Sequence, residues 1–294
     1  MKRTGLLAVI AMSVRASSSL VIPRVGVSFS PAGLLTPYHL GVASRLKELG
    51  WIRSTTALAG ASGGALAAVI SALEVPSSES LDSCCKIAER CRDQGTYRTL
   101  SLALRDELEL RISPSAADEL NSRQAPTRIG YTEISPAFFT PRFVDQFANR
   151  EDLLAVVTAS CCIPFYFSGS LATAVRGGLG CDGFFAMPRY RFGCPETFAS
   201  ELEILVTPFN PAVVGLEPRT VLAETARVSI ISPALLQGGD SGLWPYSSSQ
   251  LLKLALSPPA DSDVEIAAVY KALFQAGEAS AGSWDKQQVS TRVD

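Results

Sequence analysis

Ser62 lies in the run GASGG (residues 60–64), which fits a GxSxG pattern, in a chain that has a single histidine. A serine hydroxyl becomes a useful nucleophile when a base takes its proton and hydrogen-bond donors stabilise the oxyanion that follows. The one histidine, His39, precedes the serine, whereas in α/β-hydrolases the histidine comes last in chain order. If Ser62 is catalytic, the expected base is therefore a carboxylate.

The segments on either side of Ser62 favour a turn between a strand and a helix. Residues 55–60 predict a short buried strand and residues 65–73 a buried helix. This is the context of a nucleophile elbow, in which Gly60 and Gly64 remove side chains that would crowd the turn and the amides that begin the helix near Gly63 are unpaired. The pattern alone is weak, because a glycine-rich turn that packs a helix onto a sheet uses the same residues.

A second glycine-containing loop precedes a helix one βα unit earlier. Residues 25–30 predict the first strand, and apolar residues at helical spacing predict a helix over residues 37–49 that ends at Gly50. The carboxyl ends of both strands then meet at one edge of a parallel sheet, where the active sites of open α/β sheets form. Backbone amides of this loop could complete an oxyanion hole with that of Gly63.

The composition bounds the class of protein. A chain of 294 residues with 47% hydrophobic and 18% charged residues is long enough for one sizeable α/β domain. The net charge of -2 without a long basic run argues against a nucleic-acid partner. Seven cysteines and one histidine show no metal-ligand spacing, so we expect no metal and no cofactor, and we interpret the cysteines as small apolar residues in a reducing compartment.

The mean hydropathy of +0.21 is high for a soluble enzyme, yet no apolar run approaches the length of a transmembrane helix. Peripheral contact with lipid fits both facts. Residues 1–23 contain Lys2 and Arg3, an apolar stretch and several serines, with no acidic residue before Glu48. This pattern predicts a cleavable leader, an organelle transit peptide or a flexible N-terminus. We expect the domain over residues 24–285, a frayed segment from Gly277 onward and a flexible C-terminus over residues 286–294.

Four stretches, in order along the chain, resemble the patatin-like phospholipase family. They are SFSPAGLLTPYHLGVASRLKELG (residues 28–50), AGASGGALAA (59–68), EDLLAVVTASCCIPFYFSG (151–169) and CDGFFAMP (181–188). The YHLGVAS run is most similar to the adipose triglyceride lipase branch of that family. The resemblance implies a patatin-like three-layer α/β/α fold with a mostly parallel central sheet.

The resemblance also implies a Ser-Asp dyad, with Ser62 as nucleophile and Asp182, followed by Gly183, as general base and acid. It implies oxyanion donors in the amides of Ala32, Gly33 and Gly63. The expected function is a serine carboxylic ester hydrolase of the triacylglycerol lipase or phospholipase A type, acting through an acyl-enzyme. Taken without the resemblance, an Asp-Gly pair is more typical of a turn.

Three positions depart from the family pattern. Pro31 and Thr36 stand where the oxyanion loop usually has glycine, and Phe184 follows the Asp-Gly pair where a small residue is usual. A proline has no amide proton to donate. These departures keep open a catalytically weak homologue that binds a lipid surface or a protein partner. A third hypothesis, a nucleotide-binding α/β domain, lacks both a GxGxxG run after the first predicted strand and a Walker lysine.

His39 falls within the first predicted helix. A partly buried helix residue is favoured over a catalytic base, so we expect His39→Ala to retain most hydrolysis. The helices predicted over residues 77–111 are expected to cover the site. The aromatic residues of 138–143 and 165–169 are expected in the core, along an acyl channel or at a lipid surface.

The absence of a basic cluster near the motifs favours acylglycerols over phospholipids as substrate. The expected location is a peripheral membrane or lipid droplet surface, with routing by an N-terminal signal or transit peptide.

Overall fold

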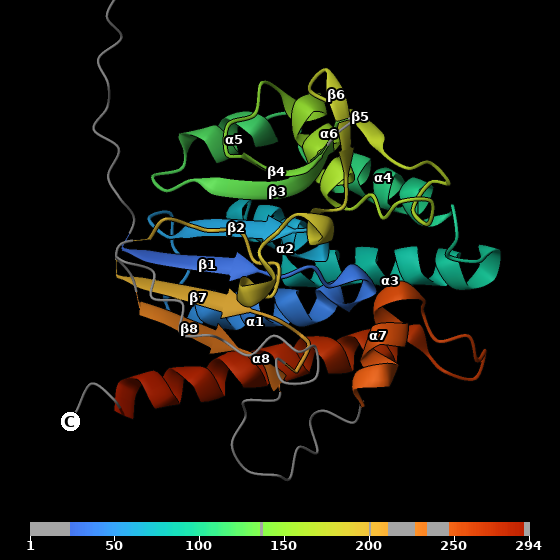
Figure 1. Ribbon diagram of the computed structural model, residues 1–294. Helices are drawn as coiled ribbons and strands as arrows, with labels where there is room; N and C mark the ends of the chain where they lie inside the picture. Colours follow the sequence, from blue (N-terminus) through green and yellow to red (C-terminus); the bar gives the residue numbers. More distant parts are fainter. Residues whose placement is uncertain (1–23, 136–137, 200, 211–226, 234–246, 291–294) are drawn as a thin grey trace, which may run out of the picture.

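The computed structural model describes residues 24–135, 138–199, 201–210, 227–233 and 247–290 (Figure 1). These residues contain an eight-stranded sheet in the order β5-β6-β3-β2-β1-β7-β8, with β4 also paired to β3. The strands are β1 Val25–Phe29, β2 Ala57–Ala61, β3 Thr127–Ile134, β4 Phe139–Val144, β5 Thr173–Val175, β6 Gly178–Cys181, β7 Leu202–Val206 and β8 Arg227–Ile231.

The strands from β3 through β2, β1 and β7 to β8 are all parallel to their neighbours, whereas β4, β5 and β6 form antiparallel pairs. This confirms the expected α/β fold with a mostly parallel sheet flanked by helices. The helices are α1 Thr36–Glu48, α2 Gly63–Ala72, α3 Ser77–Gln94, α4 Leu100–Arg111, α5 Ala116–Ser122, α6 Arg150–Ser160, α7 Ser248–Leu256 and α8 Ile266–Ser290. Three 3-10 turns complete the described elements: η1 Gly33–Leu35, η2 Gly183–Phe185 and η3 Arg189–Arg191.

The central strands are buried on both faces, which explains their nearly continuous apolar sequences. All five residues of β2 are buried. In β1, Val27 and Phe29 pack with residues of α1, α2 and α8, while Ser28 points the other way and its hydroxyl donates a 2.6 Å hydrogen bond to the carbonyl of Pro195. One face of the sheet therefore carries helices and the other carries the chain that follows β6 (Figure 1).

A buried ion pair ties this second face to the sheet. Arg191 Nη2 lies 2.6 Å from Glu203 Oε2, and the two side chains are 2% and 5% exposed. The other oxygen of Glu203 accepts hydrogen bonds from the amide and hydroxyl of Thr197. Because Glu203 is in β7, these bonds hold the segment 183–199 against the centre of the sheet.

Helix α8 corrects the expectation of a frayed end from Gly277. The helix continues to Ser290, so residues 286–290 also belong to it. Trp284 is 4% exposed and its indole N–H donates a 2.7 Å hydrogen bond to Ser229 Oγ of β8. A side chain at Gly277 would strike the backbone of Tyr38 in α1. The small residues that suggested disorder therefore let α8 lie close against α1.

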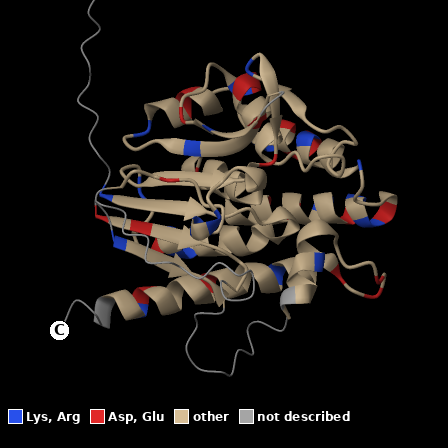
Figure 2. Ribbon diagram, in the orientation of Figure 1, with Lys and Arg blue, Asp and Glu red and all other residues tan. Residues whose placement is uncertain are grey.

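Residues 1–23, where a leader, a transit peptide or a flexible N-terminus was expected, lie outside the described residues. Among the helices that the structure describes, none is long and apolar enough to cross a membrane. Charged residues of both signs are distributed over the described part of the chain (Figure 2).

Candidate active site

Strand β3 brings Ser62 and Asp182 together. Its first half pairs with β2, so that Ala61 lies opposite Gly130, and its last residues pair with β6, so that Cys181 lies opposite Thr132. Since β4 occupies the other edge of β3 at these positions, β2 and β6 share one edge. Because β2 is parallel and β6 antiparallel to β3, the two strands run toward each other along this edge. Ser62 directly follows β2 and Asp182 directly follows β6, so the two residues lie next to each other.

The two side chains form a direct hydrogen bond. Ser62 Oγ donates to Asp182 Oδ2 at 2.8 Å. Ser62 is 5% exposed and Asp182 is 1% exposed, so the pair is almost removed from water. The serine and the carboxylate that the sequence analysis predicted as a dyad are therefore within proton-transfer distance of each other.

The backbone of Ser62 has the strained geometry of a sharp turn. Its φ of 55° and ψ of -130° lie in a region that residues with side chains rarely adopt. Ser160 Oγ accepts a 2.8 Å hydrogen bond from the Ser62 amide and donates a 2.6 Å bond to the carbonyl of Gly130. Sequence reasoning did not single out Ser160, although it belongs to the stretch 151–169 that resembles the family.

Besides Ser62, two backbone groups and one side-chain hydroxyl hold Asp182. Its Oδ1 accepts a 2.8 Å bond from the amide of Phe184, and its own amide donates to the carbonyl of Cys162 at 2.8 Å. Its carbonyl accepts from Thr132 Oγ1 at 2.7 Å. Burial raises the pKa of Asp182 to about 7, against the lowering effect of the hydrogen bonds from Phe184 and Ser62. The carboxyl group can therefore both take and give a proton near neutral pH.

The motif glycines allow close approaches of backbone segments. A side chain at Gly64 would strike the carbonyl groups of Phe29 and Ser30 at the end of β1, and one at Gly60 would strike Gly64. A Cβ on Gly183 would come within 2.6 Å of the Gly130 carbonyl. These approaches let α2 and η2 begin directly beside the strand ends that carry Ser62 and Asp182.

The predicted oxyanion residues lie in two adjoining turns. A Cβ on Gly63 would be 3.1 Å from the amide nitrogen of Gly33, so the two backbones are neighbours. Gly33 has a φ of 52°, and a side chain there would strike the carbonyl of Ala255 in α7. Ala32 is 2% exposed, and its carbonyl accepts from the amide of Leu35. No hydrogen-bond acceptor for the amides of Ala32, Gly33 or Gly63 is present among the described residues.

The structure gives physical roles to two of the departures from the family pattern. The hydroxyl of Thr36 donates a 2.8 Å hydrogen bond to the carbonyl of Gly33 and thereby fixes η1. Pro31 packs beside Gly193, on the segment that covers the second face of the sheet. Phe184 is 55% exposed and does not line the cavity described next.

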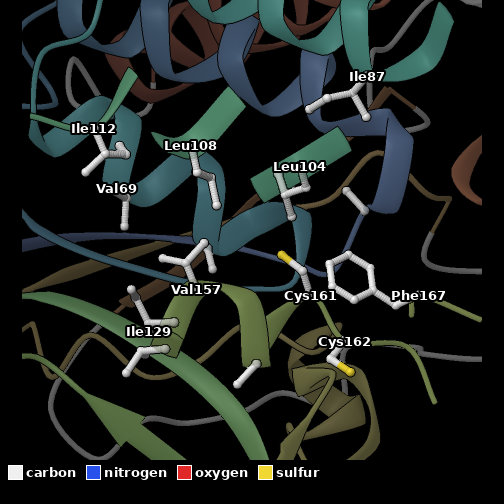
Figure 3. Close-up of a cluster of buried hydrophobic side chains, with 14 of the residues drawn as sticks. Val69, Ile87, Leu104, Leu108, Ile112, Ile129, Val157, Cys161, Cys162 and Phe167 are labelled. Atoms are coloured by element: carbon white, nitrogen blue, oxygen red, sulfur yellow. The ribbon is translucent and has the colours of Figure 1, made fainter. Parts of the chain in front are cut away.

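A narrow apolar cavity of about 60 Å³ opens at Ser62. Its walls come from η1, the start of α1, α2, α3, α4, the start of α8 and the segment after α6, and they include Leu66, Ile87, Leu104, Phe167 and Tyr270. Figure 3 shows Ile87, Leu104, Cys161 and Phe167 gathered on one side of the core. The described lining residues carry no charge, so the cavity suits a hydrocarbon chain.

The helices predicted over residues 77–111 line the cavity, whereas the aromatic residues of 138–143 and 165–169 lie partly at the cavity and partly at the surface. Helices α3 and α4 contribute Cys84, Ile87, Leu100 and Leu104 to the cavity wall. Phe167 also lines the cavity, whereas Phe165 is 58% exposed. The residues of 138–143 form β4 and its approach, where Phe138 and Phe139 are exposed.

His39 is fully buried in α1, more deeply than the sequence suggested. Its Nε2 lies 2.9 Å from the carbonyl of Ser30, and its ring packs edge-on against Phe29. Burial lowers its pKa to about 4, against the raising effect of the bond to Ser30. The imidazole is therefore neutral at pH 7, and its Nε2–H donates to Ser30 at the start of the oxyanion loop. Among the described residues, no group of three His, Cys, Asp or Glu side chains could hold a metal ion.

Comparisons with known proteins identify the family of this chain. The patatin-like phospholipase family matches residues 27–189. Patatin-like phospholipase domain-containing protein 4 of Homo sapiens is 32% identical over 171 residues, which are 54% of this chain and 64% of that protein, so the match spans less than two thirds of the relative. The crystal structure of VipD from Legionella pneumophila aligns with a TM-score of 0.43 and 11% identity over 90% of this chain and 67% of that chain. Because the family match covers more than half of the sequence, the chain belongs to the patatin-like phospholipase family.

Proposed function

We propose that this protein is a lipid acyl hydrolase that cleaves carboxylic esters through Ser62 and Asp182. The observation that carries the proposal is the 2.8 Å hydrogen bond from Ser62 Oγ to Asp182 Oδ2 at the end of an apolar cavity. Family membership supports the same class of reaction. Neither residue needs His39, whose ring is buried against β1.

In the acylation step, Asp182 takes the proton of Ser62 while Oγ attacks the ester carbonyl carbon. The electron pair of the C=O bond moves to the carbonyl oxygen, where the amides of Gly33 and Gly63, with that of Ala32, stabilise the oxyanion. As the pair returns, the bond to the leaving alcohol breaks and Asp182 gives that oxygen its proton. Ser62 then carries the acyl group as an ester.

In the deacylation step, water takes the place of the alcohol. Asp182 takes a proton from the attacking water, and the tetrahedral intermediate collapses to release the fatty acid and return the proton to Ser62 Oγ. A pKa of about 7 suits a group that must act as base and acid in turn. The N–H of Phe184 steadies the oxygen of Asp182 that does not face Ser62.

The cavity supports a lipid as the substrate. Its described walls are almost entirely hydrocarbon, and Ser62 lies on its lining, so an acyl chain in the cavity would place its ester group at the dyad. The lining offers no cation to a phosphate group, which favours acylglycerols over phospholipids. Because the apolar cavity suits a lipid substrate, we propose a peripheral location at a membrane or lipid droplet surface.

Labelling with a fluorophosphonate probe tests the proposed nucleophile. Wild-type protein should react once, with the adduct on the peptide that contains Ser62, and Ser62→Ala should not react. Asp182→Asn is the matched second variant, because it keeps the size of the side chain and removes the base, so its labelling should be much slower. Folded wild-type protein that stays unlabelled would support the alternative, a catalytically weak homologue that binds a lipid surface or a partner.

Hydrolysis assays then separate the substrate classes. Triacylglycerol emulsions and phosphatidylcholine vesicles with the same acyl chains would be compared side by side, with Ser62→Ala as blank. A higher rate on triacylglycerol is expected. A clear preference for phosphatidylcholine would contradict the choice of substrate and leave the dyad unaffected.

A further inference from the structure

Exposed apolar side chains lie on the segments that line the acyl cavity or are hydrogen-bonded to them. We call this group the apolar rim, and its members are 41% to 59% exposed: Tyr97, Leu102, Phe165, Leu171, Leu252 and Leu256. Large apolar residues exposed together on a soluble domain mark an interaction surface more often than the same residues scattered singly.

Two segments of the rim are joined by backbone hydrogen bonds. The amide of Arg98 donates to the carbonyl of Tyr166 at 2.9 Å, and the amide of Ser101 donates to that of Phe167 at 3.3 Å. The rings of Tyr97 and Tyr166 also pack edge to face, 6.3 Å apart. The start of α4 and the segment after α6 therefore form one fixed surface.

Helix α7 joins this surface from the other side of the oxyanion loop. The hydroxyl of Tyr166 donates a 2.7 Å bond to the carbonyl of Leu256. Leu251 and Ala255 are buried, and the Ala255 carbonyl touches Gly33. Leu252 and Leu256, one turn apart, face the solvent at 59% and 41% exposure. One side of α7 thus supports the catalytic loop while the other completes the rim.

In α4 and in the segment after α6, the rim and the cavity wall are the outer and inner surfaces of the same stretch of chain. Leu100 lines the cavity and Leu102 is exposed, and the same holds for Phe167 and Phe165. Residues 97–102, 163–171 and 247–257 contain two charged residues, Arg98 and Lys253, and no acidic residue. In Figure 2 the acidic residues near α7 lie in the loop that follows it.

We propose that the apolar rim is the surface through which this protein docks on a lipid–water interface, so that an acyl chain enters the cavity without crossing water. The proposal rests on the proposed hydrolase function. Insertion of exposed aromatic and leucine side chains at the headgroup boundary lowers the free energy, because their apolar area leaves water. Such insertion needs no membrane-spanning helix. The two basic residues at the rim suit the negative charge of lipid phosphates.

Flotation with phosphatidylcholine vesicles, in a Ser62→Ala background, tests the docking surface. In that background no substrate is consumed, so binding is measured whether or not the chain is a hydrolase. Phe165→Asn combined with Leu252→Gln should lower the partition coefficient about tenfold or more, because two apolar side chains are lost from the inserted surface. Thermal unfolding should stay close to that of the parent, since both side chains are exposed.

Phe198→Asn is a closely matched control. Phe198 is 60% exposed with a φ of 56°, and Phe165 is 58% exposed with a φ of 62°. Phe198 lies in the segment that covers the second face of the sheet, where the guanidinium of Arg128, near the start of β3, stacks on its ring at 4.2 Å. The control should bind vesicles as strongly as the parent.

Three results would overturn the docking surface. One is equal binding by the rim variant and its parent. Another is loss of binding by Phe139→Ser alone, which would move the interface to β4. The third is a wild-type dimer, in the absence of lipid, that the rim variant converts to a monomer, which would make a second copy the occupant. In an active background, the ratio of vesicle hydrolysis to hydrolysis of a soluble short-chain ester should also fall in the rim variant.

Discussion

The hydroxyl of Ser160 connects the amide of Ser62 to the carbonyl of Gly130, with hydrogen bonds of 2.8 and 2.6 Å. The pairing of β2 with β3 ends at Ala61 and Gly130. The hydroxyl of Ser160 provides the next link between the two strands, at the turn residue Ser62. The turn residue has an unfavourable φ of 55°, so a bond to its amide helps to hold it. Ser160, which is fully buried, is thus a positioning residue for Ser62.

Removal of the Ser160 hydroxyl should lower the turnover rate more than the affinity for substrate. Ser160→Ala leaves the Ser62 amide and the Gly130 carbonyl without their partner, at about 1–3 kcal/mol for each buried group. We expect kcat to fall at least about tenfold with KM little changed, because the cavity is untouched. Ser160→Cys, with a similar size and a weak donor, should recover part of the rate. Equal rates for wild type and Ser160→Ala would contradict the positioning role.

Two inactive variants of Ser62 should differ in stability. The φ of 55° and ψ of -130° suit glycine better than any residue with a Cβ. Ser62→Gly should therefore be more stable than Ser62→Ala by about 1–2 kcal/mol in urea unfolding. Equal stability of the two variants would mean that the turn relaxes when the serine side chain is removed.

The rate of hydrolysis should rise with pH through the titration of Asp182. The base must be ionised to take the Ser62 proton, and burial raises its pKa to about 7. We expect the logarithm of kcat/KM for a soluble ester to rise with unit slope below pH 7 and to level off above it. His39, with a pKa lowered to about 4, should not contribute to this step. An inflection below pH 5 would speak against Asp182 as the group that titrates.

The same group should make the folded protein less stable as pH rises. Asp182 ionises at about 7 in the folded state, whereas an unfolded aspartate ionises at about 3.9. Between these values the folded state keeps a proton that the unfolded state has lost, so stability declines as pH rises through that window. The side chain in Asp182→Asn does not titrate. The free energy of unfolding of this variant, relative to that of the wild type, should therefore be higher above pH 7 than at pH 4, by on the order of a few kcal/mol. A stability difference that does not change with pH would contradict the raised pKa.

Replacement of His39 should strongly reduce the free energy of unfolding and have little effect on the rate of hydrolysis. His39→Ala opens a hole in the core and removes the bond to the Ser30 carbonyl, for a loss of about 2–4 kcal/mol. Below its lowered melting temperature the variant should keep most of its hydrolysis, as we expect from the sequence. His39→Gln retains a donor at this position and serves as the comparison. A loss of activity in folded His39→Ala as complete as in Ser62→Ala would rule out the Ser-Asp assignment.

Local patterns predicted most elements near the site. Strand β1 and helix α1 begin within one residue of their predicted positions, and α2 begins at Gly63, where the glycine-rich turn implied it. These elements form from short-range patterns of apolar residues and turn glycines. The part of α8 from Gly277 onward was expected to be frayed, because Gly277 and its small neighbours resemble a linker until α1 is present beside them.

The sequence by itself determined that Ser62 follows a buried strand and begins a helix, that one histidine is available, and that Asp182 belongs to a second motif. Only the tertiary structure decided that Ser62 and Asp182, 120 residues apart, approach within 2.8 Å. It also decided that Ser160 holds the turn, that Thr36 fixes the oxyanion loop and that α7 supports it. The physical reason is that strand register and close packing bring together groups whose separation along the chain leaves no local periodicity to detect.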